Sequence, residues 1–267
     1  MVLEILVSCM NQADMSIVDQ SGITTDVLII NQCNEERLQE HIHGERRNRM
    51  ISTMDRGLSK SRNMAIEHAA GDICLFCDND EQFYHDYEQI VLAAFQRLQD
   101  ADMILFDFDN LPHYFKNEEH QLKFFDLFHA ISCQIAYRRT SLEKAGIRFN
   151  PFMGAGSGNG AQEENKFLID CYKSGMKIYY VPQKLGRIIE TESTWFTGFD
   201  EKFFYQRGGS TRQMLGLPMS ILYAFYYVFR KHDMYKEEIS LSKALAATLK
   251  GCIENPIGKQ MKQEQRC

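Results

Sequence analysis

The feature that most constrains this 267-residue chain is a short apolar run that ends in two aspartates. Residues 73–77 (ICLFC) show no alternation with polar residues, which is typical of a strand buried on both faces of a parallel sheet. Asp78, Asn79 and Asp80 follow directly. Polar residues just past the carboxyl end of a parallel strand lie where open α/β sheets bind their ligands. We therefore expect an α/β fold with a ligand site at these three residues.

Other apolar runs of strand length support the same fold class. They cover residues 3–8, 26–30 and 102–108, and further strands are expected at 133–137 and at 177–181, where Pro182 should end the strand. Asn31 and Asn34 follow the second run and are candidates for the same ligand-binding edge. Asp107 and Asp109 end the run at 102–108 and form a second Asp-x-Asp pair that rivals the first.

Helices are expected between these strands and after them. The predicted ranges are 60–70, 86–99, 140–145, 163–174, 217–231 and 239–252, with a solvated loop or hairpin at 36–50 and a frayed polar tail at 258–267. In the helix at 60–70, Ser59 is the candidate N-cap and Gly71 the stop signal. Lys60 and Arg62 oppose the helix dipole in the first turn, a conflict that a bound anion would remove. The alternative is that both side chains point into water.

Composition excludes several classes of protein. The net charge of -6 argues against a nucleic-acid binder. The amino-terminal residues lack the basic region of a signal peptide, and no uncharged stretch of about 18 residues exists, so a cytoplasmic location is the default expectation. The eight cysteines are scattered and are expected to be reduced thiols. Cys74 and Cys77 have metal-pair spacing, but an offset of three in a strand puts them on opposite faces.

Paired aspartates after a buried strand suit a hard divalent cation. Mg²⁺ and Mn²⁺ prefer carboxylate oxygens and complete their coordination with water and substrate phosphates. Asp78 and Asp80 are therefore candidate metal ligands. A metal in this place would neutralise a diphosphate leaving group.

The string from residue 56 to residue 80 resembles the family-2 glycosyltransferases of the GT-A fold. In that family a G-x-S-x-x-R-N helix, a G-D pair and an apolar strand lead into D-x-D, and the matching residues here are Gly57, Ser59, Arg62, Asn63, Gly71, Asp72, Asp78 and Asp80. The resemblance favours Asp78 and Asp80 over the rival pair, which lacks the preceding helix and glycine and is left to structural or acceptor-side roles. It implies a nucleotide-sugar site that includes Asn31, Asn34, Arg62, Asp78, Asn79 and Asp80.

A second block, residues 160–171, resembles the family's glycine-rich loop followed by an E-D element in which the second carboxylate is the general base. Here the element is Glu163-Glu164, and the resemblance implies Glu164 as the base with Glu163 as the alternative. Both glutamates could instead only favour the helix N-terminus electrostatically. Trp195 lies in a motif similar to one in bacterial capsule and exopolysaccharide transferases. With Gly158 and Gly160 it is expected to contact the acceptor, although a lone tryptophan is equally a core residue.

The resemblance implies a GT-A domain over residues 1–210, with a nucleotide-sugar half at 1–110 and an acceptor half at 111–210, and a helical extension at 211–267. The implied reaction is inverting transfer from a nucleotide-sugar, expected to be a UDP-sugar, to a hydroxyl of a glycan or polyprenyl-linked acceptor in cell-envelope polysaccharide biosynthesis. A nucleotidyltransferase and a non-catalytic partner subunit remain alternatives. The helix at 217–231 either packs on the domain or makes a peripheral contact with the inner face of the membrane.

Overall fold

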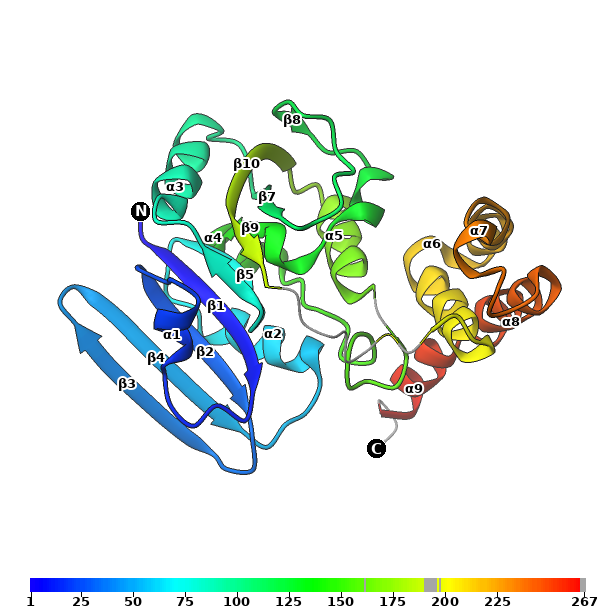
Figure 1. The fold of residues 1–267 in the computed structure, drawn as a ribbon, viewed down its shortest axis with the longest axis horizontal. Coiled ribbons are helices and arrows are strands. Elements are labelled where there is room, and N and C mark those ends of the chain that lie inside the picture. Colours follow the sequence, from blue (N-terminus) through cyan, green and yellow to red (C-terminus); the bar gives the residue numbers. More distant parts are fainter. Residues whose placement is uncertain (161, 190–195, 197, 265–267) are drawn as a thin grey trace. The chain divides into compact units, whose positions relative to one another are not determined.

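The computed structural model describes residues 1–160, 162–189, 196 and 198–264, which form two compact units (Figure 1). The first, which we call the sheet unit, comprises Met1–Arg56, Lys60–Phe149 and Phe167–Thr191. The second, the helical unit, comprises Gly57–Ser59, Asn150–Lys166 and Glu192–Cys267. The division expected at residue 210 stays a prediction.

The sheet unit is built on a 10-stranded mixed sheet with the order β3-β4-β2-β1-β5-β9-β7-β10-β6, and β8 pairs with β10. The strands are β1 (Leu3–Met10), β2 (Asp26–Gln32), β3 (Arg37–His43), β4 (Arg46–Thr53), β5 (Ile73–Cys77), β6 (Glu81–Phe83), β7 (Met103–Asp109), β8 (His120–Gln121), β9 (Ile135–Arg138) and β10 (Ile178–Ile188). β1 pairs in parallel with β2 and β5, and β2 with β4, whereas β9 runs antiparallel to β5 and β7. The expected α/β class is confirmed.

The helices of the described residues are α1 (Ile17–Gln20), α2 (Leu58–His68), α3 (Tyr87–Arg97), α4 (Arg139–Ala145), α5 (Glu163–Lys173), α6 (Glu201–Arg230), α7 (His232–Tyr235), α8 (Leu241–Glu254) and α9 (Pro256–Glu264). Short 3-10 turns, η1 and η2, cover Asp126–His129 and Ser132–Gln134. α6 is two helices joined at Gly216, whose backbone is not helical (φ 73°). No helix of the described ranges is long and apolar enough to cross a membrane.

Both faces of the central strands are buried, as their unbroken apolar runs predict. On one face, β1, β2, β5 and β7 pack against α1 and α3 through a large cluster that includes Val7, Ile29, Leu75 and Val91. On the other face, Phe76 of β5 contacts Tyr137, Phe149 and Phe167 at ring-centroid distances of 5.2, 5.4 and 6.1 Å. β5 is thereby fixed from both sides, and its end is held at a defined place.

Two predicted boundaries are wrong. β10 does not stop at Pro182 but continues to Ile188, because the register with β7 shifts between Tyr180 and Lys184, and a proline is tolerated at such an irregularity. The tail is not frayed over its described part, since α9 begins at Pro256, a residue suited to the first helical position, and buries Ile257. Of the loop or hairpin expected at 36–50, the structure has the hairpin, formed by β3 and β4.

Candidate functional site

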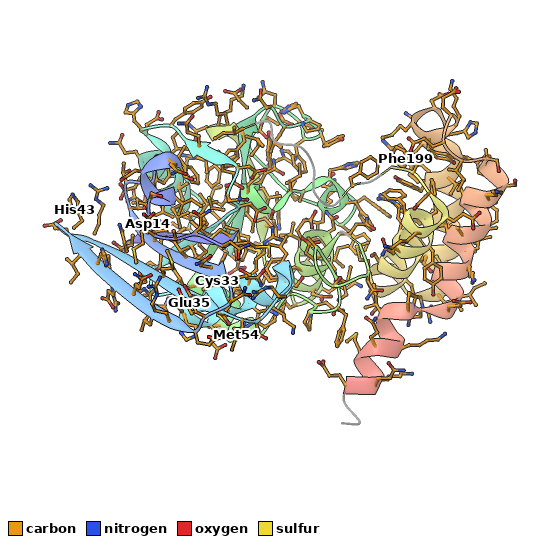
Figure 2. All side chains as sticks on the ribbon, turned by 60° about the horizontal axis from the view of Figure 1, so that its bottom comes forward. Asp14, Cys33, Glu35, His43, Met54 and Phe199 are labelled. Atoms are coloured by element: carbon orange, nitrogen blue, oxygen red, sulfur yellow. The ribbon has the colours of Figure 1, made fainter. Side chains whose placement is uncertain are left out.

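The carboxyl ends of four parallel strands meet at one edge of the sheet unit. The chain adds β2 and β4 on one side of β1 and then β5 on the other side, so the order of strand addition reverses between β1 and β5. Open α/β sheets bind ligands at such a switch point. The loops that follow β2 and β4 lie at this edge, where Cys33 N donates to Thr53 O at 2.9 Å, and Figure 2 labels Cys33 and Met54 there. Asp78 follows β5 at the same edge.

Asp78 is held by two side chains from distant parts of the sequence. Arg62 Nη2 of α2 donates to both carboxylate oxygens of Asp78 at 3.1 Å. Ser132 Oγ of η2 donates to Asp78 Oδ2 at 3.1 Å and accepts from Arg62 Nη2 at 2.8 Å. This closed triangle fixes the rotamer of the carboxylate, a role of Ser132 that has no signal in the sequence because it lies far from the recognised motifs.

The guanidinium of Arg62 is buried, and the carboxylate that it binds is partly open. The exposed fractions of the side chains are 2% for Arg62 and 31% for Asp78. The guanidinium also lies 5.5 Å from the ring centroid of Phe149, in a cation–π contact. The cation expected in the first turn of the 60–70 helix therefore points inward to the end of β5 and not into water. The reason is that Asp78 compensates its charge there.

The turn that carries Asp80 is fixed from its far side. Asp78 N donates to Glu81 Oε1 at 3.0 Å, and Ile189 N donates to Asp80 O at 2.7 Å. Burial, and then the charge of Asp78, raise the pKa of Glu81 well above its usual range. β6 begins at Glu81, directly after the aspartates, and its antiparallel pairing with β10 continues the restraint. This three-residue strand was not predicted.

The asparagines of the predicted site occupy different environments. Asn31 is fully buried, and its amide spans to the loop after β1 by accepting from Gln12 N and donating to Gln12 O, both at 2.9 Å. Asn34 is exposed and accepts from Arg56 Nη2 at 2.8 Å. Asn79 is exposed in the turn between the two aspartates. Asn34 and Asn79 lie in segments that follow parallel strands, as predicted, whereas Asn31 lies inside β2, one residue before its end. The roles of all three toward a ligand stay predictions.

The Gly71-Asp72 pair lies at the opposite edge of the sheet from Asp78. It immediately precedes β5, where Gly71 N donates to Glu4 Oε2 at 2.9 Å and Val2 N donates to Asp72 Oδ2 at 2.9 Å. A Cβ atom at Gly71 would lie 2.6 Å from Glu4 Cβ, so only glycine permits this approach. These two motif residues join β1 to the start of β5 and do not touch the end that carries the aspartates.

The rival aspartates have their own partners at the end of β7. Asp107 accepts from Tyr180 OH at 2.6 Å and from Gln134 Nε2 at 3.4 Å. Asp109 accepts from Lys184 and from Tyr84, and these bonds lower its pKa. The two residues line a cavity of about 240 Å³ together with Asn110, Leu111, His113 and Lys184. These contacts are consistent with the structural or acceptor-side roles expected of them.

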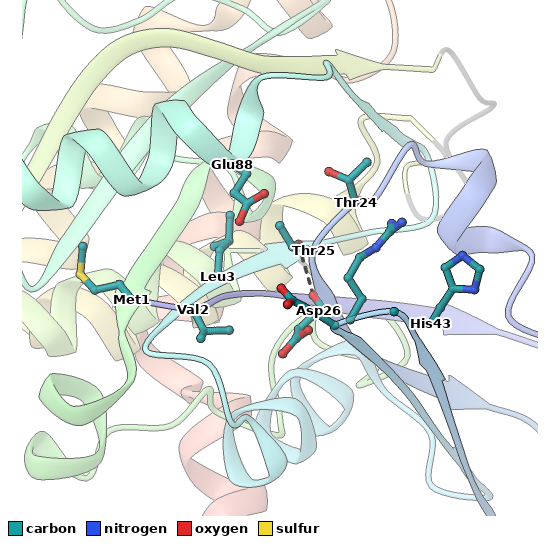
Figure 3. Close-up of a pocket in the computed structure, with 11 residues that line it drawn as sticks. Met1, Val2, Leu3, Thr24, Thr25, Asp26, His43 and Glu88 are labelled. Carbon is teal, nitrogen blue, oxygen red and sulfur yellow. Dashed lines mark hydrogen bonds between the residues drawn. The ribbon is translucent and has the colours of Figure 1, made fainter.

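A larger pocket of about 620 Å³ lies at the amino-terminal edge of the sheet (Figure 3). Its lining comes from the starts of β1 and β2, the β3–β4 turn and α3, and includes Leu3, Asp26, Arg46 and Glu88. None of the predicted site residues lines it. Because ligands of open α/β sheets bind at the carboxyl ends of the strands, we place the candidate site at Asp78 and not here.

In the helical unit, the glycine-rich loop has a conformation that requires glycine. Gly154, Gly156, Gly158 and Gly160 all have φ between 77° and 92°, which side chains of L-residues rarely adopt. Gly154 N donates to Gly160 O at 2.7 Å, and Gln206 Nε2 of α6 donates to Gly158 O at 2.6 Å. Ser59 Oγ donates to Met153 O at 2.6 Å and lies inside α2, so its prediction as the N-cap is wrong.

α5 begins at the two candidate bases. Glu163 is 5% exposed, and its carboxylate packs so closely on Gly154 that a Cβ atom there would lie 2.9 Å from Glu163 Cδ. Glu164 is half-buried. Both residues make further interactions within the structure. Trp195 lies outside the described residues.

Asp78 and Asp80 are the candidate ligands for a divalent cation. No group of three or more His, Cys, Asp or Glu side chains that could hold a metal exists among the described residues. A site of two carboxylates completed by substrate phosphates and water needs no third protein ligand. The partly exposed Asp78 and the half-buried Asp80 fit such a site.

Comparison with known proteins gives the fold and the family. The family described as "Glycosyl transferase family 2" matches residues 3–146. No curated protein sequence matches the chain. Among solved structures, S. aureus TarS 1-349 is 13% identical with a TM-score of 0.63, covering 94% of this chain and 81% of that one.

Two further structures were solved with nucleotide-sugars. S. aureus TarS 1-349 in complex with UDP-GlcNAc is 14% identical with a TM-score of 0.63, covering 89% of this chain and 74% of that one. The mannosyltransferase PcManGT from Pyrobaculum calidifontis in complex with GDP-Man and Mn²⁺ is 10% identical with a TM-score of 0.51, covering 98% and 79%. These likenesses establish the GT-A fold. Because the family match covers more than half of this chain, the chain belongs to glycosyl transferase family 2.

Proposed function

We propose that this protein transfers a sugar from a UDP-sugar to a hydroxyl of a glycan or polyprenyl-linked acceptor, with inversion at the anomeric carbon. The observation that carries the proposal is the carboxylate of Asp78 held by Arg62 and Ser132 at the β1/β5 switch point. A preorganised charge at the ligand-binding edge of the sheet fits a family of nucleotide-sugar enzymes. The nucleotide-sugars bound to TarS and PcManGT support the donor class.

On the donor side, Asp80 with Asp78 would hold Mn²⁺ or Mg²⁺. The metal, when bound, supplies positive charge that neutralises the diphosphate leaving group. Asp78 contacts either the metal or the ribose, and Asn31, Asn34 and Asn79 belong to the segments around the nucleoside. Arg62 fixes Asp78 and adds a positive charge near the donor phosphates.

On the acceptor side, Glu164 is the proposed general base. The acceptor oxygen attacks the anomeric carbon, the bond from that carbon to the diphosphate oxygen breaks, and the acceptor proton passes to the Glu164 carboxylate. The half-buried position of Glu164 suits this role better than that of Glu163, which packs on Gly154. Gly158, Gly160 and Trp195 are the proposed acceptor contacts.

Paired isosteric variants test the assignment of the base. We expect Glu164→Gln to lower the rate of UDP release in the presence of acceptor by about a hundredfold or more, since general-base catalysis contributes roughly that much. UDP-sugar affinity measured by calorimetry should not change. Glu163→Gln is the matched control and should retain most of the turnover. If neither glutamine variant slows UDP release, the assigned base is wrong.

A further inference from the structure

We propose that residues 217–230, the second half of α6, bind an anionic membrane surface through one exposed face of the helix. The proposal goes beyond the transfer reaction, because it rests on the surface of the helical unit and not on the chemistry at Asp78.

The outward face of this helix is apolar along its whole length. Leu222, Tyr226 and Phe229 are 62%, 61% and 56% exposed, and their spacing places them in one stripe. Leu217, Met219 and Phe225 extend the exposed surface beside the stripe. No charged residue occurs from residue 217 to residue 229. An exposed surface of this size and composition marks a site of contact with a partner or a membrane.

The opposite face of the same helix already forms the core of its unit. Tyr227 and Val228 are buried in a cluster with Phe204 of α6 and Tyr235 of α7, and Ala224 is also buried. The guanidinium of Arg207 lies 3.7 Å from the ring centroid of Tyr227. A helix that is apolar all round is normally covered on all sides. The exposed stripe is therefore a preformed surface that the described residues of the helical unit do not cover.

The charge of residues 217–267 favours an anionic lipid surface as the partner. The chain as a whole carries 30 Lys and Arg against 36 Asp and Glu, whereas residues 217–267 carry eight against five. Arg230 and Lys231 follow the stripe directly. Lys236 pairs with Asp233 at 3.4 Å and adds no net charge there. The carboxyl-terminal part of this acidic chain is therefore net basic, and the two cations at the end of the stripe complement an anionic headgroup layer.

The dimensions fit a helix that lies flat in the interface. The uncharged run of thirteen residues is about 20 Å long at the rise of an α-helix. The hydrocarbon core of a bilayer is about 30 Å thick. Tyr226 also has the amphipathic ring that is favoured at headgroup depth.

Co-sedimentation with vesicles tests the proposal. We expect the wild-type protein to pellet with vesicles of phosphatidylcholine and phosphatidylglycerol, and to bind less when phosphatidylglycerol is omitted or salt is raised. The double variant L222D/F229D should bind the anionic vesicles about a hundredfold more weakly, because it removes two anchoring side chains. The matched control L38D/I42D changes two equally exposed apolar residues of β3 (67% and 76%) and should bind like the wild type.

The outcomes separate the membrane from other partners. Equal pelleting of the wild type and L222D/F229D, with both folded by circular dichroism, would overturn the proposal. So would a wild-type dimer in lipid-free light scattering that L222D/F229D converts to a monomer, since a second copy would then cover the stripe. UDP-sugar affinity in solution should be the same for both proteins, so a failure of donor binding reports on the proposed function alone.

Discussion

The pair of Arg62 and Asp78 makes an asymmetric prediction about stability. Asp78→Asn removes a carboxylate that pairs with a guanidinium only 2% exposed. Removing one partner of a buried ion pair costs about 3–5 kcal/mol. Because Asp78 is 31% exposed, water reaches the site, and we expect a loss of about 2–3 kcal/mol in the free energy of unfolding.

Removing the Arg62 guanidinium should lower the free energy of unfolding less than removing the Asp78 carboxylate does. In Arg62→Met, Asp78 keeps its hydrogen bond from Ser132 and its contact with water, while methionine replaces part of the buried volume. We expect a loss of about 1 kcal/mol for this variant, and R62M/D78N should lose a similar amount because the buried guanidinium has been removed together with the carboxylate. The double variant should therefore be more stable than Asp78→Asn alone, by about 1–2 kcal/mol.

Urea denaturation of metal-free protein, followed by circular dichroism, measures these differences. Asp100→Asn serves as a control, because it breaks an exposed pair with Lys177 and should leave the midpoint nearly unchanged. If the losses in the free energy of unfolding of the two single variants simply add in R62M/D78N, the two side chains are not coupled as expected. Arg62 would then stabilise the fold through contacts other than the one with Asp78.

Two further predictions concern the glycine-rich loop and the buried carboxyl. Gly154→Ala should destabilise the protein by about 1–2 kcal/mol more than Gly175→Ala in the same urea assay. Both glycines have φ of 92°, but only at Gly154 does the new Cβ atom meet the Glu163 carboxylate. For Glu81, a raised folded-state pKa means that the folded protein binds the proton more tightly, so stability falls as pH rises above 4.5. Glu81→Gln should flatten this decline in metal-free protein, and an unchanged slope would contradict the raised pKa of Glu81.

The core strands and the main motif were predictable because each is a local pattern. The run at 73–77 matches β5 at both ends. All five apolar residues are buried, and the charged residues Asp72 and Asp78 mark the ends of the buried segment. The resemblance over residues 56–80 falls within the region that the family match covers. Local sequence therefore identified the edge of the sheet where the candidate site lies.

The features that were missed depend on tertiary contacts. Ser132 donates a hydrogen bond to Asp78, which lies 54 positions away in the sequence. No sequence pattern near Ser132 predicts this contact. Ser59 has the residue type of an N-cap, but its hydroxyl donates a hydrogen bond to the carbonyl oxygen of Met153. Pro182 predicts the end of a strand, but β10 continues past it because the register with β7 shifts at this position. In each case a partner distant in the sequence decided between two locally acceptable outcomes.

The central claim is that the turn at Asp78–Asp80 binds a nucleotide-sugar. The most direct measurement is calorimetric titration of UDP and a panel of UDP-sugars with the wild type and Asp80→Asn, each with and without Mn²⁺. We expect the wild type to bind UDP in the presence of Mn²⁺. Both Asp80→Asn and removal of the metal should weaken binding at least about tenfold, because the charge of the diphosphate is then no longer neutralised. Wild-type protein that binds no nucleotide under any of these conditions, or Asp80→Asn protein that binds UDP as tightly as the wild type does, would contradict this claim.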